Sequence, residues 1–342
     1  MHPIQIAEKY FLPRWVLGLG IRKLLKIRLQ ELSKSSAHPN FKQKFLDELK
    51  NSPLALETQA ANAQHYEVPS AFFDLALGKR HKYSSCYWDS SVKTLDEAEE
   101  RMLWLVVNKA GLKDGMRVLD LGCGWGSLSL FICEFFPNCK VTGLSNSNSQ
   151  RQWILNRAKQ KSFSNLEIMT GDINTIEMSR QFDRVFSIEM FEHLRNYQKL
   201  FKKIRSWLAD DGQMFVHIFC HRQTPYLFET QGEGNWMGRY FFTGGIMPSF
   251  ELFEAFNEDL VVKEKMFLNG RHYEKTAFAW EENMIKHQGE VLQIFSEVYG
   301  KTEAVRWFNR WRIFFLACAY CFGFSGGKEW GVGHYLFEPA KP

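Results

Sequence analysis

The sequence predicts an α/β fold in which a doubly wound, mostly parallel sheet of seven strands is covered by helices on both faces. Three observations lead to this prediction. Short apolar runs alternate with helix-length segments between residues 94 and 220, which is the pattern of a parallel sheet. A glycine-rich turn joins the first of these runs to a helix. The chain of 342 residues, 45% hydrophobic and 24% charged, is long enough to bury a core without disulfides or metals.

Seven segments have the length and composition of buried strands. They are Arg117–Leu121, Lys140–Leu144, Leu166–Thr170, Asp183–Ile188, Gln213–Cys220, Leu260–Leu268 and Gly331–Phe337. One helix is expected to begin at Ser127, and a separate helix to end at Ala158. A third is expected from Tyr197 to Leu208, followed by a turn at Asp210-Asp211-Gly212. Helices are also expected through most of residues 276–322. The chain is thereby divided into N-terminal helices at residues 1–93, an α/β core at 94–220, and a helical cap with the final strands at 221–342.

The basic charge of the chain is concentrated near its N-terminus. The first 50 residues hold ten of the 43 Lys and Arg but only four of the 38 Asp and Glu, so the rest is close to neutral. This distribution argues against a nucleic-acid partner.

Between residues 17 and 32, leucines and Ile21 form one helical stripe opposite Arg22, Lys23 and Lys26. The stripe fits a helix docked on its own protein, and this interpretation is favoured because Arg28 interrupts the stripe. It also fits weak peripheral contact with an anionic membrane. The sequence leaves the oligomeric state open, a homodimer included.

Cysteine usage indicates a reducing compartment. Seven cysteines, an odd number without regular spacing, do not suggest a disulfide framework. Pro13 and Arg14 interrupt any secretory signal core, and the longest apolar run, residues 313–324, is too short to span a bilayer. We therefore expect a cytoplasmic protein.

The strongest local motif is the turn after the first strand, where Asp120 precedes Gly122, Gly124 and Gly126. Glycines suit a tight turn at which a ligand approaches the backbone beside a helix N-terminus. A dinucleotide site would prefer G-x-G-x-x-G and an acidic residue closing the second strand. Here the motif is G-x-G-x-G, and the second strand ends in Gly143-Leu144-Ser145. A nicotinamide cofactor is therefore disfavoured.

An acidic residue before G-x-G-x-G is typical of S-adenosylmethionine-dependent methyltransferases. From about His65 to the C-terminus the chain resembles the group that contains cyclopropane-fatty-acid synthases and coclaurine-type N-methyltransferases. The segments that carry the likeness are Val118–Ser127, Thr142–Ser147 with Gln150, His65-Tyr66, Tyr83–Trp88 and Leu95–Glu100. The resemblance implies a class I methyltransferase sheet, an N-terminal helical lid and S-adenosylmethionine as cofactor.

The resemblance also implies which residues bind the cofactor. Tyr83 and Ser84 would touch its methionine part, with Asp120, Gly122 and Gly124 packed beside it. Ser145 and Gln150 would hold the ribose in place of the missing acid. Asp172, followed by Ile173, would accept a hydrogen bond from the adenine amino group, although a lone Asp after a strand is also a common turn residue.

A second constellation, Glu189, Glu192 and His193, follows the fourth strand. Offsets of three and four residues would bring the three side chains to one side of a helical turn, at the sheet edge where α/β proteins bind ligands. Two carboxylates beside an imidazole can orient the ring and handle a proton. Glu192 and His193 match the whole group. Glu189 matches the N-methyltransferases, because lipid cyclopropane synthases generally carry Gly there.

Other residues resemble the bicarbonate site of cyclopropane synthases. His217 and Tyr273 match positions that bind bicarbonate together with the equivalent of Glu192, but Ser85 stands where a Cys belongs, with Cys86 one place later, and Phe219 replaces a smaller residue. His217 and His221 alternate along the fifth strand and, with Cys220, suggest a metal; no fourth ligand or paired spacing supports one. Cys318 and Cys321 read as core packing.

The leading interpretation is N-methylation of a small amine. Glu189, Glu192 and His193 would serve the acceptor, and the rings of Tyr83, Trp236 and Tyr240 would hold the cationic amine in a substrate pocket. Ser85, His217, His221 and Tyr273 are also expected to line this substrate or bicarbonate pocket. The alternative is C-methylation of lipid alkenes, as in cyclopropane-fatty-acyl-phospholipid synthases. A third hypothesis is a cofactor-binding protein without catalysis, against which the intact catalytic triplet argues.

Overall fold

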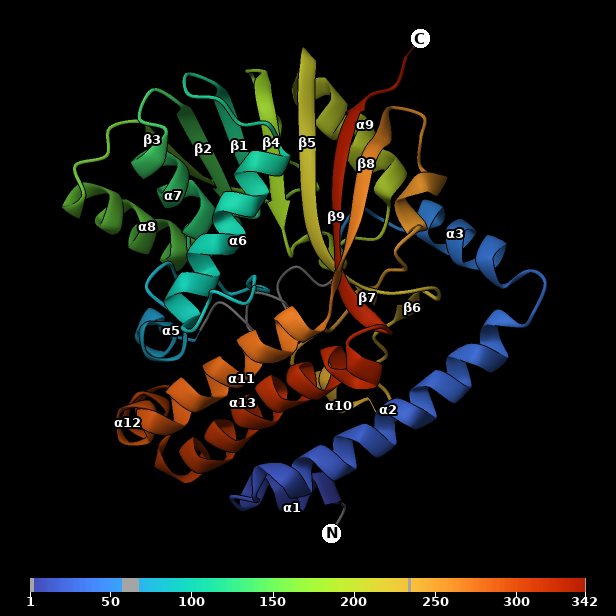
Figure 1. The fold of residues 1–342 in the computed structure, drawn as a ribbon, viewed down its shortest axis with the longest axis vertical. Coiled ribbons are helices and arrows are strands. Elements are labelled where there is room, and N and C mark those ends of the chain that lie inside the picture. Colours follow the sequence, from blue (N-terminus) through green and yellow to red (C-terminus); the bar gives the residue numbers. More distant parts are fainter. Residues whose placement is uncertain (1–2, 57–67, 233–234, 342) are drawn as a thin grey trace.

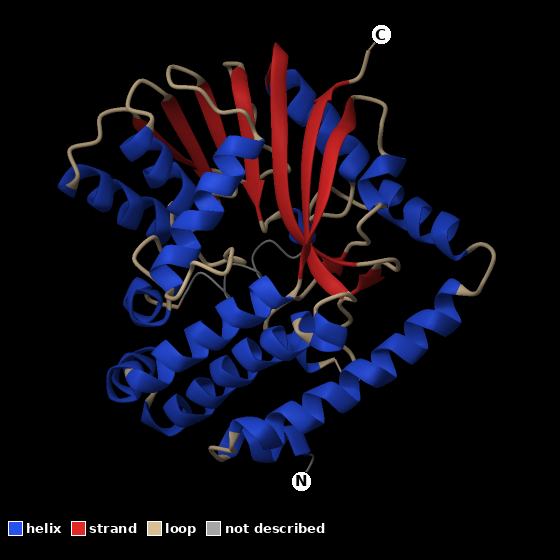
Figure 2. Cartoon of the chain, in the orientation of Figure 1, coloured by secondary structure: helices blue, strands red, loops and turns tan. Residues whose placement is uncertain are grey.

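A computed structural model describes residues 3–56, 68–232 and 235–341 of the chain. Its centre is a seven-stranded sheet in the order β3-β2-β1-β4-β5-β9-β8 (Figures 1 and 2). The strands of this sheet are β1 Arg117–Leu121, β2 Lys140–Ser145, β3 Leu166–Thr170, β4 Phe182–Ile188, β5 Leu208–His221, β8 Leu260–Asn269 and β9 Trp330–Pro339. All seven expected strands are therefore present.

The sheet is mostly parallel, as expected. Strands β3, β2, β1, β4 and β5 run parallel, and β9 enters antiparallel between β5 and β8. Chain order reverses between β1 and β4, and the carboxyl ends at such a switch point flank a ligand-binding crevice. The strand order is that of the doubly wound sheet expected from the sequence.

Helices cover both faces of the sheet (Figure 1). On one face lie α6 Leu95–Lys109, α7 Ser127–Phe135 and α8 Asn148–Gln160; on the other lie α9 Tyr197–Trp207 and α3 Phe41–Asn51. The α6 helix begins at a capping box, in which Thr94 accepts from the Glu97 amide and Glu97 accepts from the Thr94 amide. Such a cap stabilises a helix start by about 1 kcal/mol.

A layer of helices lies beyond the carboxyl ends of the parallel strands (Figure 2). This layer contains α1 Pro3–Lys9, α2 Arg14–Ser36, α5 Ser70–Ala76, α10 Trp236–Tyr240, α11 Arg271–Lys286, α12 Gln288–Tyr299 and α13 Lys301–Phe322, with the two-stranded sheet of β6 Tyr226–Leu227 and β7 Ile246–Met247. Aromatic rings form much of its core, and Trp311 in α13 packs against Phe72, Phe73 and Phe241. Most of the aromatic content is therefore core packing.

Two local expectations need comment. The turn at Asp210-Asp211-Gly212 is not a separate connection, because β5 already begins at Leu208 and its pairing with β4 shifts from Phe182–Leu208 to Arg184–Gln213. The extra residues form a bulge within the strand.

In α2, Leu17 and Leu32 are buried and only Leu24 of the expected stripe is strongly exposed, at 57%. The stripe thus faces the protein, as a docked helix requires.

Among the described residues, no helix combines the length and the apolar composition needed to cross a bilayer. The cysteines at 318 and 321 belong to the packed interior of α13, with Cys318 buried and Cys321 half-buried, and all seven cysteines are free thiols.

Candidate active site

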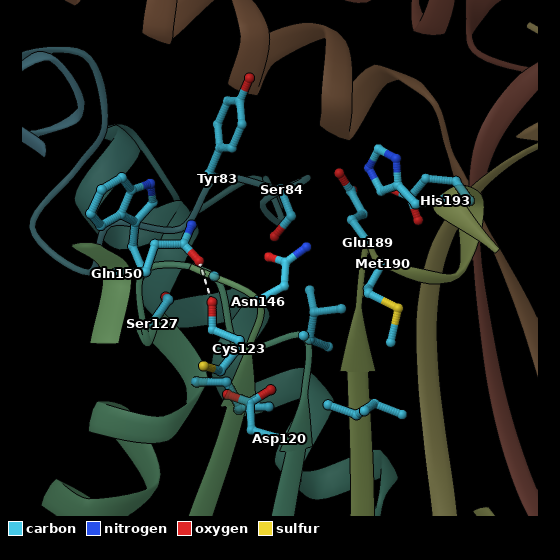
Figure 3. A pocket seen from close by; sticks show the side chains of 18 of the residues that line it. Tyr83, Ser84, Asp120, Cys123, Ser127, Asn146, Gln150, Glu189, Met190 and His193 are labelled. Atoms are coloured by element: carbon cyan, nitrogen blue, oxygen red, sulfur yellow. Dashed lines mark hydrogen bonds between the residues drawn. The ribbon is translucent and has the colours of Figure 1, made fainter. Parts of the chain in front are cut away.

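One pocket opens at the switch point, between the carboxyl ends of β1, β2 and β4 and the helical layer. Thirteen of the predicted site residues line it: Tyr83, Ser84, Asp120, Gly122, Gly124, Ser145, Gln150, Asp172, Ile173, Glu189, Glu192, His193 and Tyr273. Figure 3 labels some of them, and these fall into two groups. Asp120 and Gln150 lie on the side of β1 and β2, while Glu189 and His193 lie beyond the tip of β4. The His65-Tyr66 pair lies outside the described residues.

The turn after β1 brings the backbone close to the pocket. Gly122 and Gly124 have φ angles of +79° and +52°, which side-chain-bearing residues rarely adopt. A Cβ at Gly122 would also lie 2.5 Å from Cγ of Met190. The amides of Gly122 and Cys123 both donate to the Leu144 carbonyl at 2.9 Å, so the turn is fixed against the end of β2.

Asp120 forms the floor of the pocket. Its side chain is buried, and Oδ2 accepts a 2.7 Å hydrogen bond from Ser129. Burial raises the pKa of Asp120 to about 6, against the opposing effect of that hydrogen bond. A carboxyl group held this way prefers a cationic or hydrogen-bonding ligand to restore its charge.

Ser145 and Gln150 meet across the pocket wall. The Ser145 hydroxyl donates to Gln150 Oε1 at 2.7 Å (Figure 3), while Gln150 Nε2 is buried and has no hydrogen-bond partner among the described residues. A buried amide donor without a partner is costly unless a ligand satisfies it. Asp172 accepts from the backbone and side chain of Asn174 through Oδ1, so it forms a turn as well as lining the pocket.

Residues 78–86, which we call the strap, carry Tyr83, Ser84 and Ser85 over the pocket. The strap is tied to α6 by Glu99, whose carboxylate accepts from the amides of Gly78, Arg80 and Lys82 at 2.8–3.1 Å. Burial raises the pKa of Glu99 to about 7, although these three amides favour its charged form. One buried carboxyl group therefore holds three backbone amides of the strap.

Sequence reasoning missed Lys82. Its side chain is 2% exposed and lines the pocket, and its ammonium group donates to Ser84 Oγ at 2.5 Å and to the Ser85 carbonyl at 2.7 Å. Desolvation lowers the pKa of Lys82, opposed by the carboxylates of Glu189 and Glu99. No pattern in the sequence distinguishes this lysine from a surface lysine.

Glu189 is held by three hydrogen-bond donors. Tyr273 donates to Oε2 at 2.6 Å, while the Ser85 amide at 3.0 Å and His217 Nε2 at 3.2 Å reach Oε1. Burial raises the pKa of Glu189, and the charge of Lys82, the Ser85 amide and Tyr273 act against that rise. The four groups come from the strap, β4, β5 and α11, so the fold itself assembles this network.

The backbone at Glu189 differs from the expected helical turn. Glu189 has a left-handed φ of +46°, and only Phe191–His193 form a 3₁₀ turn. The Glu189 amide instead donates to the His217 carbonyl at 2.8 Å and extends the β4–β5 ladder. The three catalytic candidates still line one pocket, but through this bend rather than through helical periodicity.

Glu192 and His193 occupy the acceptor side of the pocket. Glu192 is 2% exposed, and its Oε2 has no hydrogen-bond partner among the described residues. Burial and the neighbouring charge of Glu189 raise the pKa of Glu192 well above its usual range. The His193 ring stacks on Phe242 with centroids 5.8 Å apart, and Phe242 and Phe314 complete this wall.

Five predicted pocket residues do not line the pocket. Ser85 contributes its amide rather than its hydroxyl, and His217 lies behind Glu189. His221 accepts from the amides of Gln223 and Thr224 and so closes a loop. The other two are aromatic residues that pack elsewhere: Trp236 donates to Glu8 at 2.8 Å, and Tyr240 lies under Arg310.

The metal hypothesis finds no geometry to support it. Nε2 of His217 faces Glu189, whereas Nδ1 of His221 accepts from loop amides. Across the described residues, no three His, Cys, Asp or Glu side chains gather as a cation site would require. Phe219 packs edge-on against Phe242 at 5.6 Å, so it supports the aromatic wall from behind.

Comparison with known proteins agrees with this geometry. Residues 55–326 match the family model described as mycolic acid cyclopropane synthetase. The chain belongs to this family of S-adenosylmethionine-dependent methyltransferases. It is 36% identical over 328 residues to (S)-coclaurine N-methyltransferase of Thalictrum flavum subsp. glaucum, covering 93% of this chain and 91% of the relative. It is 28% identical over 236 residues to cyclopropane-fatty-acyl-phospholipid synthase of Escherichia coli strain K12, covering 68% of this chain and 59% of that enzyme.

Solved structures give the same result. A coclaurine N-methyltransferase bound to N-methylheliamine and S-adenosylhomocysteine superposes with a TM-score of 0.92 at 33% identity, and the match covers 98% of each chain. A mycolic acid cyclopropane synthase complexed with S-adenosylhomocysteine matches with a TM-score of 0.70 at 23% identity, covering 83% of this chain and 99% of the other. The second match supports the fold alone.

Proposed function

We propose that this methyltransferase transfers the methyl group of S-adenosylmethionine to the nitrogen of a small amine. The observation that carries the proposal is the environment of Glu189. His217 and Tyr273, which the family resemblance associates with bicarbonate in lipid cyclopropane synthases, both contact the Glu189 carboxylate. A carboxylate of the chain itself therefore occupies the donors that a bicarbonate ion would need. The coclaurine and pavine N-methyltransferases among the relatives support the same acceptor class.

The cofactor supplies an activated methyl group, so the protein must bind, orient and handle one proton. Gln150 and Asp172 line the part of the pocket assigned to the ribose and adenine, and Tyr83 and Ser84 the part assigned to the methionine. The unpartnered Gln150 amide is suited to a ribose hydroxyl. We keep the division predicted from the sequence: residues 1–93 cover the cofactor, 94–220 bind it, and 221–342 shape the acceptor pocket.

At the acceptor side, Glu189 provides fixed negative charge that attracts an ammonium group. Both of its oxygens already accept hydrogen bonds, so we assign proton removal to Glu192. Its raised pKa makes it a stronger base than an exposed carboxylate and better able to compete with an amine for the proton. His193, fixed against Phe242, lines the same side and orients the acceptor.

The test of this assignment uses Glu192→Gln and His193→Ala. We expect both to lose turnover by at least about 100-fold and to bind S-adenosylhomocysteine as the wild type does in calorimetry. Glu177→Gln, an identical change at a carboxylate that is 77% exposed, is the matched control and should leave turnover unchanged. Full activity in both pocket variants would contradict the catalytic roles.

Isotope labelling separates the two enzyme hypotheses. With a fully deuterated S-adenosylmethionine methyl group, an N-methyl product keeps three deuterons, whereas ring closure on an alkene loses one. We expect three deuterons in a small water-soluble amine from a metabolite extract and no label in phospholipid acyl chains. A lipid with two deuterons would favour the cyclopropane alternative, and no turnover with any extract would favour a non-catalytic binding protein.

For the compartment, we propose the cytoplasm, which the seven free cysteines support. A fluorescent fusion viewed in intact cells tests it, and fluorescence confined to membranes would instead favour the lipid contact of residues 17–32.

A further inference from the structure

A second buried histidine stands behind the acceptor site. His334 in β9 pairs directly with His217 in the antiparallel β5–β9 ladder, and directly paired residues project from the same face of a sheet. Nε2 of His334 lies 2.9 Å from Nδ1 of His217, and Nε2 of His217 lies 3.2 Å from Glu189 Oε1. The two rings are 2% and 0% exposed. Glu189, His217 and His334 therefore form a continuous chain from the pocket into the sheet.

The chemistry of each link fixes where the protons lie. An ionised carboxylate only accepts hydrogen bonds, so Glu189 favours the His217 tautomer that carries its proton on Nε2. Burial lowers the pKa of both histidines well below the usual value, so each is neutral and has one N–H. Nδ1 of His217 then accepts, which requires a proton on Nε2 of His334. Glu189 and His334 therefore favour the same His217 tautomer, and losing either partner weakens that preference.

The far end of the chain agrees with this assignment. Nδ1 of His334 is buried and has no hydrogen-bond partner among the described residues, and the ring packs edge-on against Phe215 at 5.1 Å. With the proton on Nε2, this nitrogen is an acceptor rather than a second donor. A buried polar atom without a partner is costly, so stability alone does not account for the pair.

We propose that His334 is a positioning residue that fixes His217 as its Nε2–H tautomer and, through it, holds the Glu189 carboxylate in the acceptor site. This inference rests on the proposed function, because it gives Glu189 a role toward the amine. His334 does not line the pocket. It acts only through the proton on His217, and that proton can be observed without any turnover.

The experiment is nitrogen NMR of the ¹⁵N-histidine-labelled protein, since protonated and bare ring nitrogens of a neutral imidazole have distinct shifts. Signals are assigned by their loss in His217→Gln and His334→Leu. We expect His217 to carry its proton on Nε2 in the wild type and in His334→Gln, whose side-chain amide keeps a donor. In His334→Leu we expect both His217 tautomers. A proton on Nδ1 of wild-type His217 would overturn the proposal.

Kinetics provide the second arm. His334→Leu should lower kcat about 10-fold to 100-fold, as loss of a histidine-orienting partner does elsewhere, with the Kd for S-adenosylhomocysteine unchanged and activity largely retained in His334→Gln. A pure His217 Nε2–H tautomer in a folded His334→Leu would overturn the inference. If His334→Leu does not fold, the wild-type and His334→Gln spectra still decide it. If the tautomers are as expected but kcat is unchanged in both variants, the result supports His334 as the residue that fixes the tautomer of His217. It then overturns the proposed role of Glu189.

Discussion

Glu189 combines a left-handed backbone with a carboxylate that three donors hold, and the two features are separable by mutation. At φ +46°, a residue with a Cβ costs about 1 kcal/mol or more relative to glycine. Glu189→Gly and Glu189→Ala both remove the carboxylate, but only the first relieves the backbone. We therefore expect Glu189→Gly to be more stable than Glu189→Ala by about 1 kcal/mol, the reverse of the usual order.

Both variants leave buried donors at Tyr273, the Ser85 amide and His217 without their acceptor. With a cost of about 1–3 kcal/mol for an unsatisfied buried group, partly recovered by water, we expect each variant to be about 2–4 kcal/mol less stable than the wild type. Urea unfolding measures these differences, provided that the slope m is unchanged. Glu177, which has no positive φ, is the control position, where alanine should be at least as stable as glycine.

The same pair of variants tests the function of the carboxylate. Turnover should fall in both, and added bicarbonate or formate should restore part of it in Glu189→Gly, because a carboxylate-sized gap remains among three donors. Equal stability of the glycine and alanine variants would refute the backbone argument. Wild-type turnover in either variant would refute the electrostatic role.

Three further predictions concern the cofactor and the acceptor. Because the pKa of Asp120 is raised to about 6, its charge forms as pH rises from 5 to 7. S-adenosylhomocysteine, whose homocysteine part carries an ammonium group, should bind about tenfold more tightly over that range, and Asp120→Asn should show a flat profile in calorimetry. Lys82 is the only Lys or Arg among the described residues lining the pocket, so Lys82→Met should weaken S-adenosylhomocysteine at least about tenfold. It should leave the affinity for 5′-methylthioadenosine unchanged, because that molecule lacks the carboxylate that Lys82 would bind. Equal losses of affinity for the two ligands would contradict a pairing between Lys82 and the carboxylate. Phe242→Ala should raise the KM for the amine about tenfold, whereas Tyr240→Ala, outside the pocket, should not; equal effects in steady-state assays would contradict the aromatic wall.

The sheet and the cofactor side could be predicted because their signals are local. Strand length, the glycine-rich turn and residues that directly follow parallel strands can be read within short windows, and carboxyl ends of parallel strands share one edge. Asp120 and Asp172 reach the same pocket for this reason. The proposed division at residues 93/94 and 220/221 rests on the same kind of pattern.

The acceptor side could be predicted less well because its contacts are non-local. Tyr240 and Phe242 are two residues apart, yet only Phe242 lines the pocket, since residue type does not give side-chain direction at the end of a short helix. Lys82 has no sequence feature that predicts its burial. His334 meets His217 through the antiparallel register of strands more than 100 residues apart, which composition cannot supply.

The strap has a thermodynamic consequence. Ser84 lines the pocket, and the amide of the next residue, Ser85, donates to Glu189, so one short segment touches both the cofactor side and the acceptor side. A ligand that shifts the strap on one side changes the affinity for the other ligand. Linkage makes that change reciprocal, because the factor by which the amine alters cofactor affinity equals the factor by which the cofactor alters amine affinity. The order of binding is then set by the association and dissociation rates, while the coupling free energy between the two ligands arises from the strap.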